Sequence, residues 1–142
     1  MTPEIEQVYL EELNQRQQTD ARYSIIVEMV VNSGRLVELR LRPDATLFLA
    51  NNMIDMIISP LQSAPEKYRW FNQGGDFTAD LFKILADDMT AIVSVAADIA
   101  RSRERDYISS TSALYAVARV LPELRINQVQ LWGRSTSHIS QN

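Results

Sequence analysis

The chain lacks cysteine entirely and has a single histidine, His138, among its 142 residues. Without thiols it can form neither disulfides nor thiolate metal sites, and no cysteine can act as a nucleophile. His138 lies in the polar run that ends the chain, where an imidazole is poorly held. The sequence therefore contains no serine, histidine and acid arrangement and no zinc pattern. We predict no catalytic residues, no metal site and no cofactor.

Long apolar runs are also missing. No segment approaches 18 consecutive apolar residues, and the N-terminus, MTPEIEQVYL, has no basic segment followed by an apolar one. We therefore expect neither a membrane span nor a secretory signal, and together with the lack of cysteine this favours the cytoplasm. The formal net charge of −4 argues against general nucleic-acid binding, because neutralising phosphates requires a net basic face.

What the chain does have is material for a core, because 46% of its residues are hydrophobic. We predict a single α+β domain over residues 1–134, followed by a flexible polar tail over 135–142. The predicted element order is helix, strand, strand, three helices and strand. In this fold, about four helices cover a small antiparallel sheet made of a hairpin and a C-terminal strand.

The most regular pattern lies between residues 76 and 105 and predicts one long helix. Apolar side chains recur there at steps of three or four, at Leu81, Leu85, Met89, Ile92, Ala96 and Ile99. About 28 residues make a rod about 42 Å long, whereas a sphere of this many residues is about 37 Å across. Phe82 and Val93 lie off the main stripe, so apolar surface covers more than one side. Either the other helices of the chain or a second copy must cover it.

Residues 23–42 show the clearest alternation and predict a β-hairpin. If Asn32, Ser33 and Gly34 form a three-residue loop, the alternate apolar residues of both strands share one face. Residues 125–134 alternate less perfectly, with β-branched and aromatic side chains, and predict the third strand.

Three further helices are expected from their start and stop signals. One begins at residues 2–4, where Thr, Pro and Glu follow one another, and a second runs from 43 to 60 between two prolines. A third begins with a cap at residues 109–111 and ends at Pro122. Its apolar side is predicted to comprise Leu114, Val117, Ala118 and Leu121.

Two clusters of arginine and aromatic residues are the candidate binding sites, namely Arg69, Trp70 and Phe71, and Trp132 with Arg134. Arginine and tryptophan can stack on a planar ligand, bind a phosphate or anchor a protein partner. The alternative is that these tryptophans fill the core at loop junctions.

Other charged residues give less specific signals. The arginines 101, 103 and 105, with Arg119 and Arg125, fit either a basic rim or a solvated helix end. Asp87 and Asp88 are neighbours on the long helix and point about 100° apart, so they do not form a catalytic dyad. A solvated helix face explains both carboxylates better than a buried one.

These observations favour a non-enzymatic, homo-oligomeric interaction protein, regulatory or inhibitory, that associates through the long helix and occupies the surface of a partner. The alternative hypothesis is a sequestering protein that binds a small anionic molecule or a nucleotide. Its site would be lined by arginine and tryptophan at a junction between subunits or between helix and sheet. The identity of the partner or ligand does not follow from the sequence.

Overall fold

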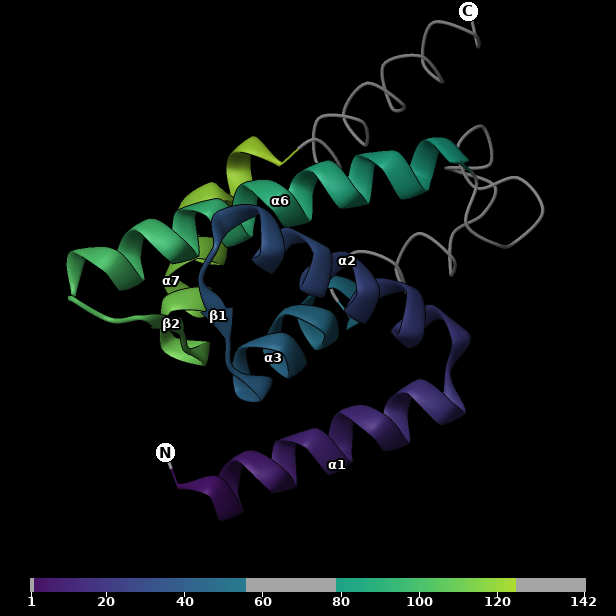
Figure 1. The fold of residues 1–142 in the computed structure, drawn as a ribbon. Coiled ribbons are helices and arrows are strands. Elements are labelled where there is room, and N and C mark those ends of the chain that lie inside the picture. Colours follow the sequence, from purple (N-terminus) through teal and green to yellow (C-terminus); the bar gives the residue numbers. More distant parts are fainter. Residues whose placement is uncertain (1, 56–78, 125–142) are drawn as a thin grey trace, which may run out of the picture.

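The computed structural model describes residues 2–55 and 79–124, with side chains from residue 82 onward in the second range. The helices of these residues are α1 (Pro3–Thr19), α2 (Ala21–Val37), α3 (Pro43–Met53), α6 (Ala79–Ser102) and α7 (Ser110–Val120). Two strands of two residues each, β1 (Arg40–Leu41) and β2 (Tyr107–Ile108), pair in parallel. A short 3-10 turn, Leu121–Glu123, follows α7. The predicted α+β fold is therefore wrong, since the described chain is a helical assembly without an antiparallel sheet (Figure 1).

The predicted hairpin is replaced by a helix, because residues 23–37 all belong to α2. The buried side chains of α2 recur at helical spacing, at Tyr23, Ile26, Val27, Met29, Val30, Ser33 and Gly34. Both faces of the predicted strand contained apolar residues, so alternation alone did not decide between the two periods. Ser33, which was assigned to the turn, donates its hydroxyl to the Met29 carbonyl at 2.9 Å and lies 3.3 Å from the Thr90 hydroxyl.

Gly34 is needed for a different reason than a hairpin turn. A Cβ atom added at Gly34 would lie 2.5 Å from Cδ1 of Leu41, the second residue of β1. The missing side chain therefore lets β1 pack closely against the helix that precedes it.

The same element order occurs twice in the described residues. α2, β1 and α3 follow one another, and so do α6, β2 and α7 (Figure 1). Arg40 lies opposite Tyr107 and Leu41 opposite Ile108, and the Arg42 amide extends this ladder by donating to the Ile108 carbonyl at 3.1 Å. Each strand leads directly into a helix, so α3 and α7 begin near each other and pack together.

The predicted long helix is confirmed as α6, although its predicted start at Asp76 lies outside the described residues and it ends at Ser102 rather than at Arg105. It packs against α2, α7 and β2. Its buried side chains come from more than one side of the rod, at Ile84, Leu85, Met89, Ile92, Val93, Ala96, Ala97 and Ala100. The helices of the same chain thus cover most of the apolar surface that suggested a second copy, while Phe82 stays 45% exposed.

Helix α1 lies on the outside of the assembly, against α2 and α3 (Figure 1). It begins as predicted, because the Thr2 hydroxyl accepts the Ile5 amide at 3.3 Å and Pro3 occupies the first turn. Leu13 is its one buried residue, and Arg40 of β1 also holds the helix through an ion pair of 2.7 Å to Glu6.

Helix α7 also begins where predicted, since the Ser109 hydroxyl accepts the Ser112 amide at 3.3 Å. Its buried residues are Ser112, Ala113, Ala116, Val117 and Val120. The predicted apolar side was wrong in part, because Leu114 is 51% exposed and Ala118 is exposed as well. The helix buries mainly small side chains, which allow close packing between helices. The prediction missed them because a hydrophobicity pattern gives small side chains less weight than leucine.

Several predictions fall outside the described residues. These are the strand over 125–134, the tail over 135–142 and the end of the helix expected to reach residue 60. Within residues 2–55 and 79–124, no helix combines the length and the apolar character that crossing a bilayer requires.

Candidate functional site

The buried carboxylate of Asp44, 3% exposed, joins the two junctions between strand and helix. It accepts Nε and Nη2 of Arg42 at 2.9 and 3.0 Å, and it accepts the backbone amide of Ser110 at 2.9 Å. A residue in the first turn of α3 thereby caps the first turn of α7, where a negative charge is favourable. The carboxylate fixes the Arg42 guanidinium and the start of α7 relative to each other.

The electrostatics of this pair follow from its burial. Removal from water by itself raises the pKa of Asp44, but the hydrogen bonds from Arg42 and Ser110 outweigh it and hold the pKa below its usual value. The same contact with Asp44 raises the pKa of Arg42. Both side chains are therefore charged at neutral pH.

A cavity of about 240 Å³ opens beside this junction. It is lined by Arg42, Arg103, Arg105, Tyr107, Ser109, Thr111 and Ser112. Arg42 follows β1, whereas Arg103 and Arg105 belong to the connection between α6 and β2. The parallel pairing of the strands therefore brings three guanidinium groups to one cavity.

The contacts of the three arginines leave hydrogen-bond donors available. Arg42 uses Nε and Nη2 for Asp44, and its Cζ lies 4.7 Å from the centre of the Tyr107 ring, so Nη1 has no acceptor among the described residues. Arg105 donates Nη1 to the Tyr107 hydroxyl at 3.1 Å. Cζ of Arg103 lies 5.2 Å from the centre of the Tyr115 ring, and its guanidinium donates no hydrogen bond to a described residue.

The first turn of α7 adds polar groups to the same cavity. The Ser110 amide is taken by Asp44 and the Ser112 amide by Ser109, whereas the Thr111 amide has no partner within the described ranges. The positive end of the helix dipole lies here as well. The lining residues include no carboxylate, imidazole or thiol, so the cavity can bind an anion but has no general base to activate a hydroxyl.

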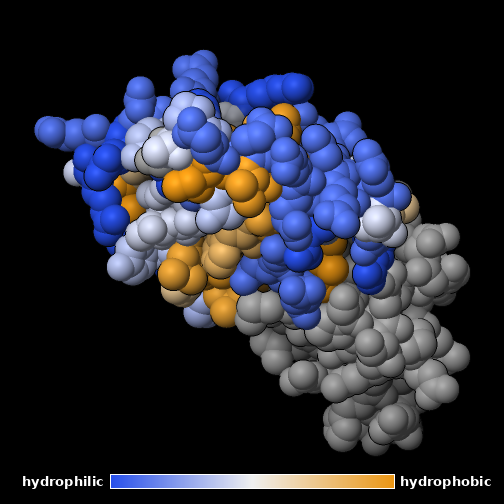
Figure 2. All heavy atoms as spheres, turned by 90° about the horizontal axis from the view of Figure 1, so that it is seen from below, coloured by the Kyte–Doolittle hydropathy of each residue, from blue (hydrophilic) through white to orange (hydrophobic). Residues whose placement is uncertain are grey.

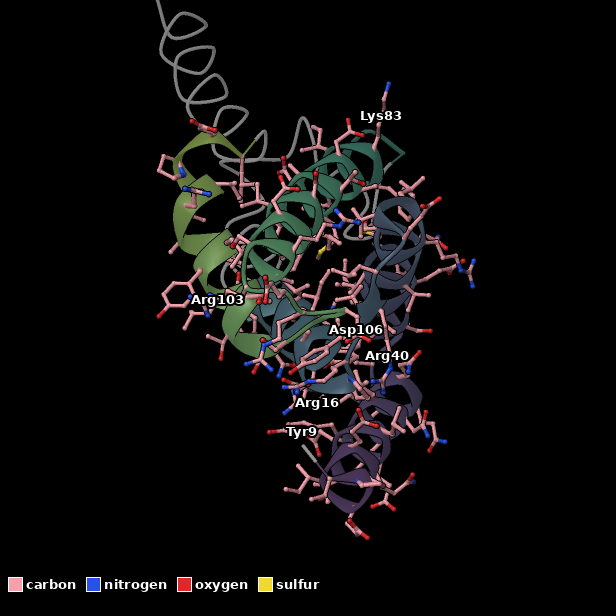
Figure 3. The ribbon with its side chains drawn as sticks, turned by 60° about the vertical axis from the view of Figure 1, so that its left-hand side comes forward. Tyr9, Arg16, Arg40, Lys83, Arg103 and Asp106 are labelled. Atoms are coloured by element: carbon pink, nitrogen blue, oxygen red, sulfur yellow. The ribbon has the colours of Figure 1, made fainter. Side chains whose placement is uncertain are left out.

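Acidic residues lie near the cavity but do not line it. Glu104 and Asp106 belong to the same connection as Arg103 and are exposed. Figure 3 labels Arg103 and Asp106, which lie well apart in that view. Of the four charged residues of this connection, the two arginines line the cavity and the two carboxylates do not.

The predicted site residues are not among those described. Arg69, Trp70, Phe71, Trp132 and Arg134 all lie outside the described ranges. Of the predicted basic rim, Arg103 and Arg105 line the cavity, whereas Arg101 donates to the Val37 carbonyl and Arg119 is exposed on α7 away from the lining.

Sequence reasoning missed Arg42 as a site residue, because it was placed at the end of a predicted strand. The available signal was local. Arg42 and Asp44 flank Pro43, and an acidic residue two positions after an arginine at a helix start favours an ion pair. No pattern in the sequence connects this pair to Arg103.

The two adjacent carboxylates of α6 differ in burial. Asp87 is exposed, as predicted, but Asp88 is 2% exposed, so the solvated face expected for it is wrong. Asp88 lies four residues from Ile84 and Ile92, which are buried in the same stripe. No group of three or more metal-binding side chains occurs in residues 2–55 and 79–124.

The chain matches no protein-family model, and the comparison with curated proteins and with solved structures found no similar one. The residues around the cavity are therefore the basis on which a function can be inferred.

Proposed function

We propose that this protein binds a small anionic ligand in the cavity formed by Arg42, Arg103 and Arg105. The observation that carries the proposal is the convergence of three guanidinium groups from two separate junctions on one cavity. A small anionic ligand was the alternative hypothesis drawn from the sequence, and we keep that class of ligand. The proposal assigns that ligand to residues other than the predicted clusters at 69–71 and 132–134.

The state of Arg42 supports this proposal. Its side chain is 15% exposed, and its guanidinium is fixed by two bonds to Asp44 before any ligand arrives. An arginine that is already ordered loses little conformational entropy on binding, and its planar group suits phosphate and carboxylate oxygens. Arg103 and Arg105, which are exposed, line the same cavity.

A test is available with inorganic phosphate, titrated calorimetrically against chloride at constant ionic strength. We expect binding to the wild type and a loss of about 10-fold to 100-fold in affinity for Arg103→Ala or Arg105→Ala. A hydrogen bond to a charged group is worth about 1.5–3 kcal/mol, and about 1.4 kcal/mol is a tenfold change.

Arg119→Ala is the matched control, because it removes the same charge from an exposed position of α7 that does not line the cavity. Equal losses in all three variants would show a general charge effect and contradict the site. No heat of binding with the wild type, at phosphate concentrations up to the millimolar range, would remove the proposal.

A different surface supports a second function. We infer from it that the protein is a homo-oligomeric interaction protein of regulatory or inhibitory type. A cavity of about 170 Å³ lies between α2 and α6, and its lining includes Met29, Leu36, Phe82 and Ala86. Leu36 is 72% exposed and Phe82 45% exposed. Exposed apolar side chains beside a groove favour association, and Phe82 belongs to the long helix through which association was predicted.

The decisive variant for association is the double substitution Leu36→Glu with Phe82→Glu. We expect the wild type to form dimers or larger assemblies at micromolar concentration in light scattering. The double variant is expected to be monomeric, because two charges at an apolar interface are costly to bury.

The control for this variant uses another exposed apolar side chain. The face on the α1 side of the molecule also shows apolar patches (Figure 2), and Val8 of α1 is 63% exposed. Val8→Glu should leave the assembly unchanged. A monomeric wild type at these concentrations would exclude this second function.

A further inference from the structure

The charges around the cavity leave two positive groups without a counter-ion. Arg42 is compensated by Asp44. Neither Arg103 nor Arg105 forms an ion pair with a described residue. A ligand group with two negative charges would therefore neutralise the cavity, whereas a monoanion would leave one guanidinium uncompensated.

The guanidinium groups of the lining also favour a ligand group with two negative charges by their hydrogen bonding. The three guanidinium groups only donate and no carboxylate lines the cavity, so the acceptors of the lining are the hydroxyl groups of Tyr107, Ser109, Thr111 and Ser112, which also donate. A fully ionised phosphate group only accepts, and it presents three terminal oxygens. A protonated phosphate carries an O–H group that needs an acceptor, and a phosphodiester has fewer charged oxygens for the three arginines.

The ring of Tyr107 is already in contact with guanidinium groups. Cζ of Arg42 lies 4.7 Å and Cζ of Arg105 lies 5.9 Å from its centre. It is the single aromatic side chain of the lining. The lining therefore favours contacts to a phosphate group over stacking of a planar ring attached to it.

We infer that the cavity binds the dianion of a phosphomonoester in preference to phosphodiesters and to the singly charged monoester. This inference rests on the proposed anion-binding function and specifies its ligand class. The chemistry is shared by a free phosphorylated small molecule and by a phosphorylated serine or threonine side chain of another protein.

Affinity should follow the second ionisation of the ligand, which for phosphomonoesters has a pKa of about 6. Arginine side chains stay protonated through this range. Asp44 stays ionised because its pKa lies below the usual value. The other titratable side chains near the lining residues are Tyr107, Tyr115, Glu104, Asp106 and Glu6, which acts on Arg42 from α1. A ligand of constant charge reports on their titration.

The experiment is a calorimetric titration with three probes, methyl phosphate, dimethyl phosphate and sulfate, each at about pH 7.5 and about pH 5, on either side of the ligand's second pKa. We expect methyl phosphate to bind about tenfold more weakly at the lower pH, because only about a tenth of it is then dianionic. Sulfate, a dianion at both pH values, should change little. Dimethyl phosphate should bind at least about tenfold more weakly than methyl phosphate at the higher pH, a difference of about 1.4 kcal/mol.

Three outcomes would overturn this inference while leaving anion binding intact. These are equal affinities for methyl and dimethyl phosphate, an affinity for methyl phosphate that does not change with pH, and a fall for sulfate as large as the fall for methyl phosphate. If none of the three probes binds, the proposed function itself fails.

A fourth titration distinguishes the two sources of the ligand. It uses a short peptide of glycine and alanine with one phosphoserine, compared with methyl phosphate at the higher pH. Equal affinities support a free small molecule, in which the phosphate group is the whole recognition element. An affinity for the peptide that is about tenfold higher, or about 1.4 kcal/mol, supports a phosphorylated protein side chain.

Discussion

Asp44 determines the arrangement of the site more than any residue that lines the cavity. Its carboxylate is buried and accepts three hydrogen bonds, from two nitrogens of Arg42 and from the Ser110 amide. It belongs to α3, yet it holds an arginine that follows β1 and the first amide of α7. A single side chain thus connects three elements.

At this scale we expect Asp44→Asn to lower the free energy of unfolding by about 2–4 kcal/mol, because one partner of a buried ion pair is lost. Urea denaturation monitored by circular dichroism measures the effect. Asp98→Asn is the control. Its carboxylate is 75% exposed and lies 4.0 Å from Arg101, so its loss should cost less than about 0.5 kcal/mol. Similar costs for both variants would contradict the role of Asp44.

The same residue makes stability depend on pH. Because the pKa of Asp44 in the folded state lies below its usual value, the unfolded state takes up a proton at a higher pH than the folded state. The contribution of Asp44 is therefore complete above about pH 5 and is lost as the pH falls below about 4, the ordinary range of an aspartate.

Urea midpoints between neutral pH and about pH 3, which spans the ordinary aspartate pKa, should accordingly fall more steeply for the wild type than for Asp44→Asn. Asp20, whose pKa is also lowered, by its contact with Arg22, remains in both proteins. Parallel pH profiles of the two proteins would show that Asp44 does not titrate as described.

At the scale of elements, the sequence predicted helices far better than it predicted strands. Caps at Thr2 and Ser109 and the apolar stripe of α6 were correctly identified, because each is a local signal. The strands have two residues each, which is too short to carry a periodicity, and they pair across a long stretch of chain. Helix α2 was missed because its β-branched residues fit the alternation of a strand as well as the three-to-four spacing of a helix.

The close approach of α2 and β1 at Gly34 gives a prediction at this scale. We expect Gly34→Val to lower the free energy of unfolding by about 1–3 kcal/mol, because added methyl groups collide with Leu41 and overpacking is costly. Ser24→Val, at an exposed position of the same helix, should change stability by about 0.5 kcal/mol or less. A neutral Gly34→Val would contradict the packing of β1 on α2.

For the whole molecule, the site arises where two helix, strand and helix units meet. Arg42 comes from the first unit, and Arg103 and Arg105 come from the second, so neither unit alone contains the cavity. Sequence reasoning found a possible basic rim at 101–105, but it could not place Arg42 beside it. Their proximity depends on the parallel pairing of β1 and β2, which no local pattern encodes.

The most direct test of the anion site locates binding on the backbone. It is a titration of the full chain with inorganic phosphate, followed by amide chemical shifts in NMR at constant ionic strength. We predict that the largest changes fall on the amides of Arg42, Asp44 and residues 103–112 and that they disappear in the variant Arg103→Ala with Arg105→Ala. Changes centred elsewhere, or the same changes in that double variant, would contradict the site.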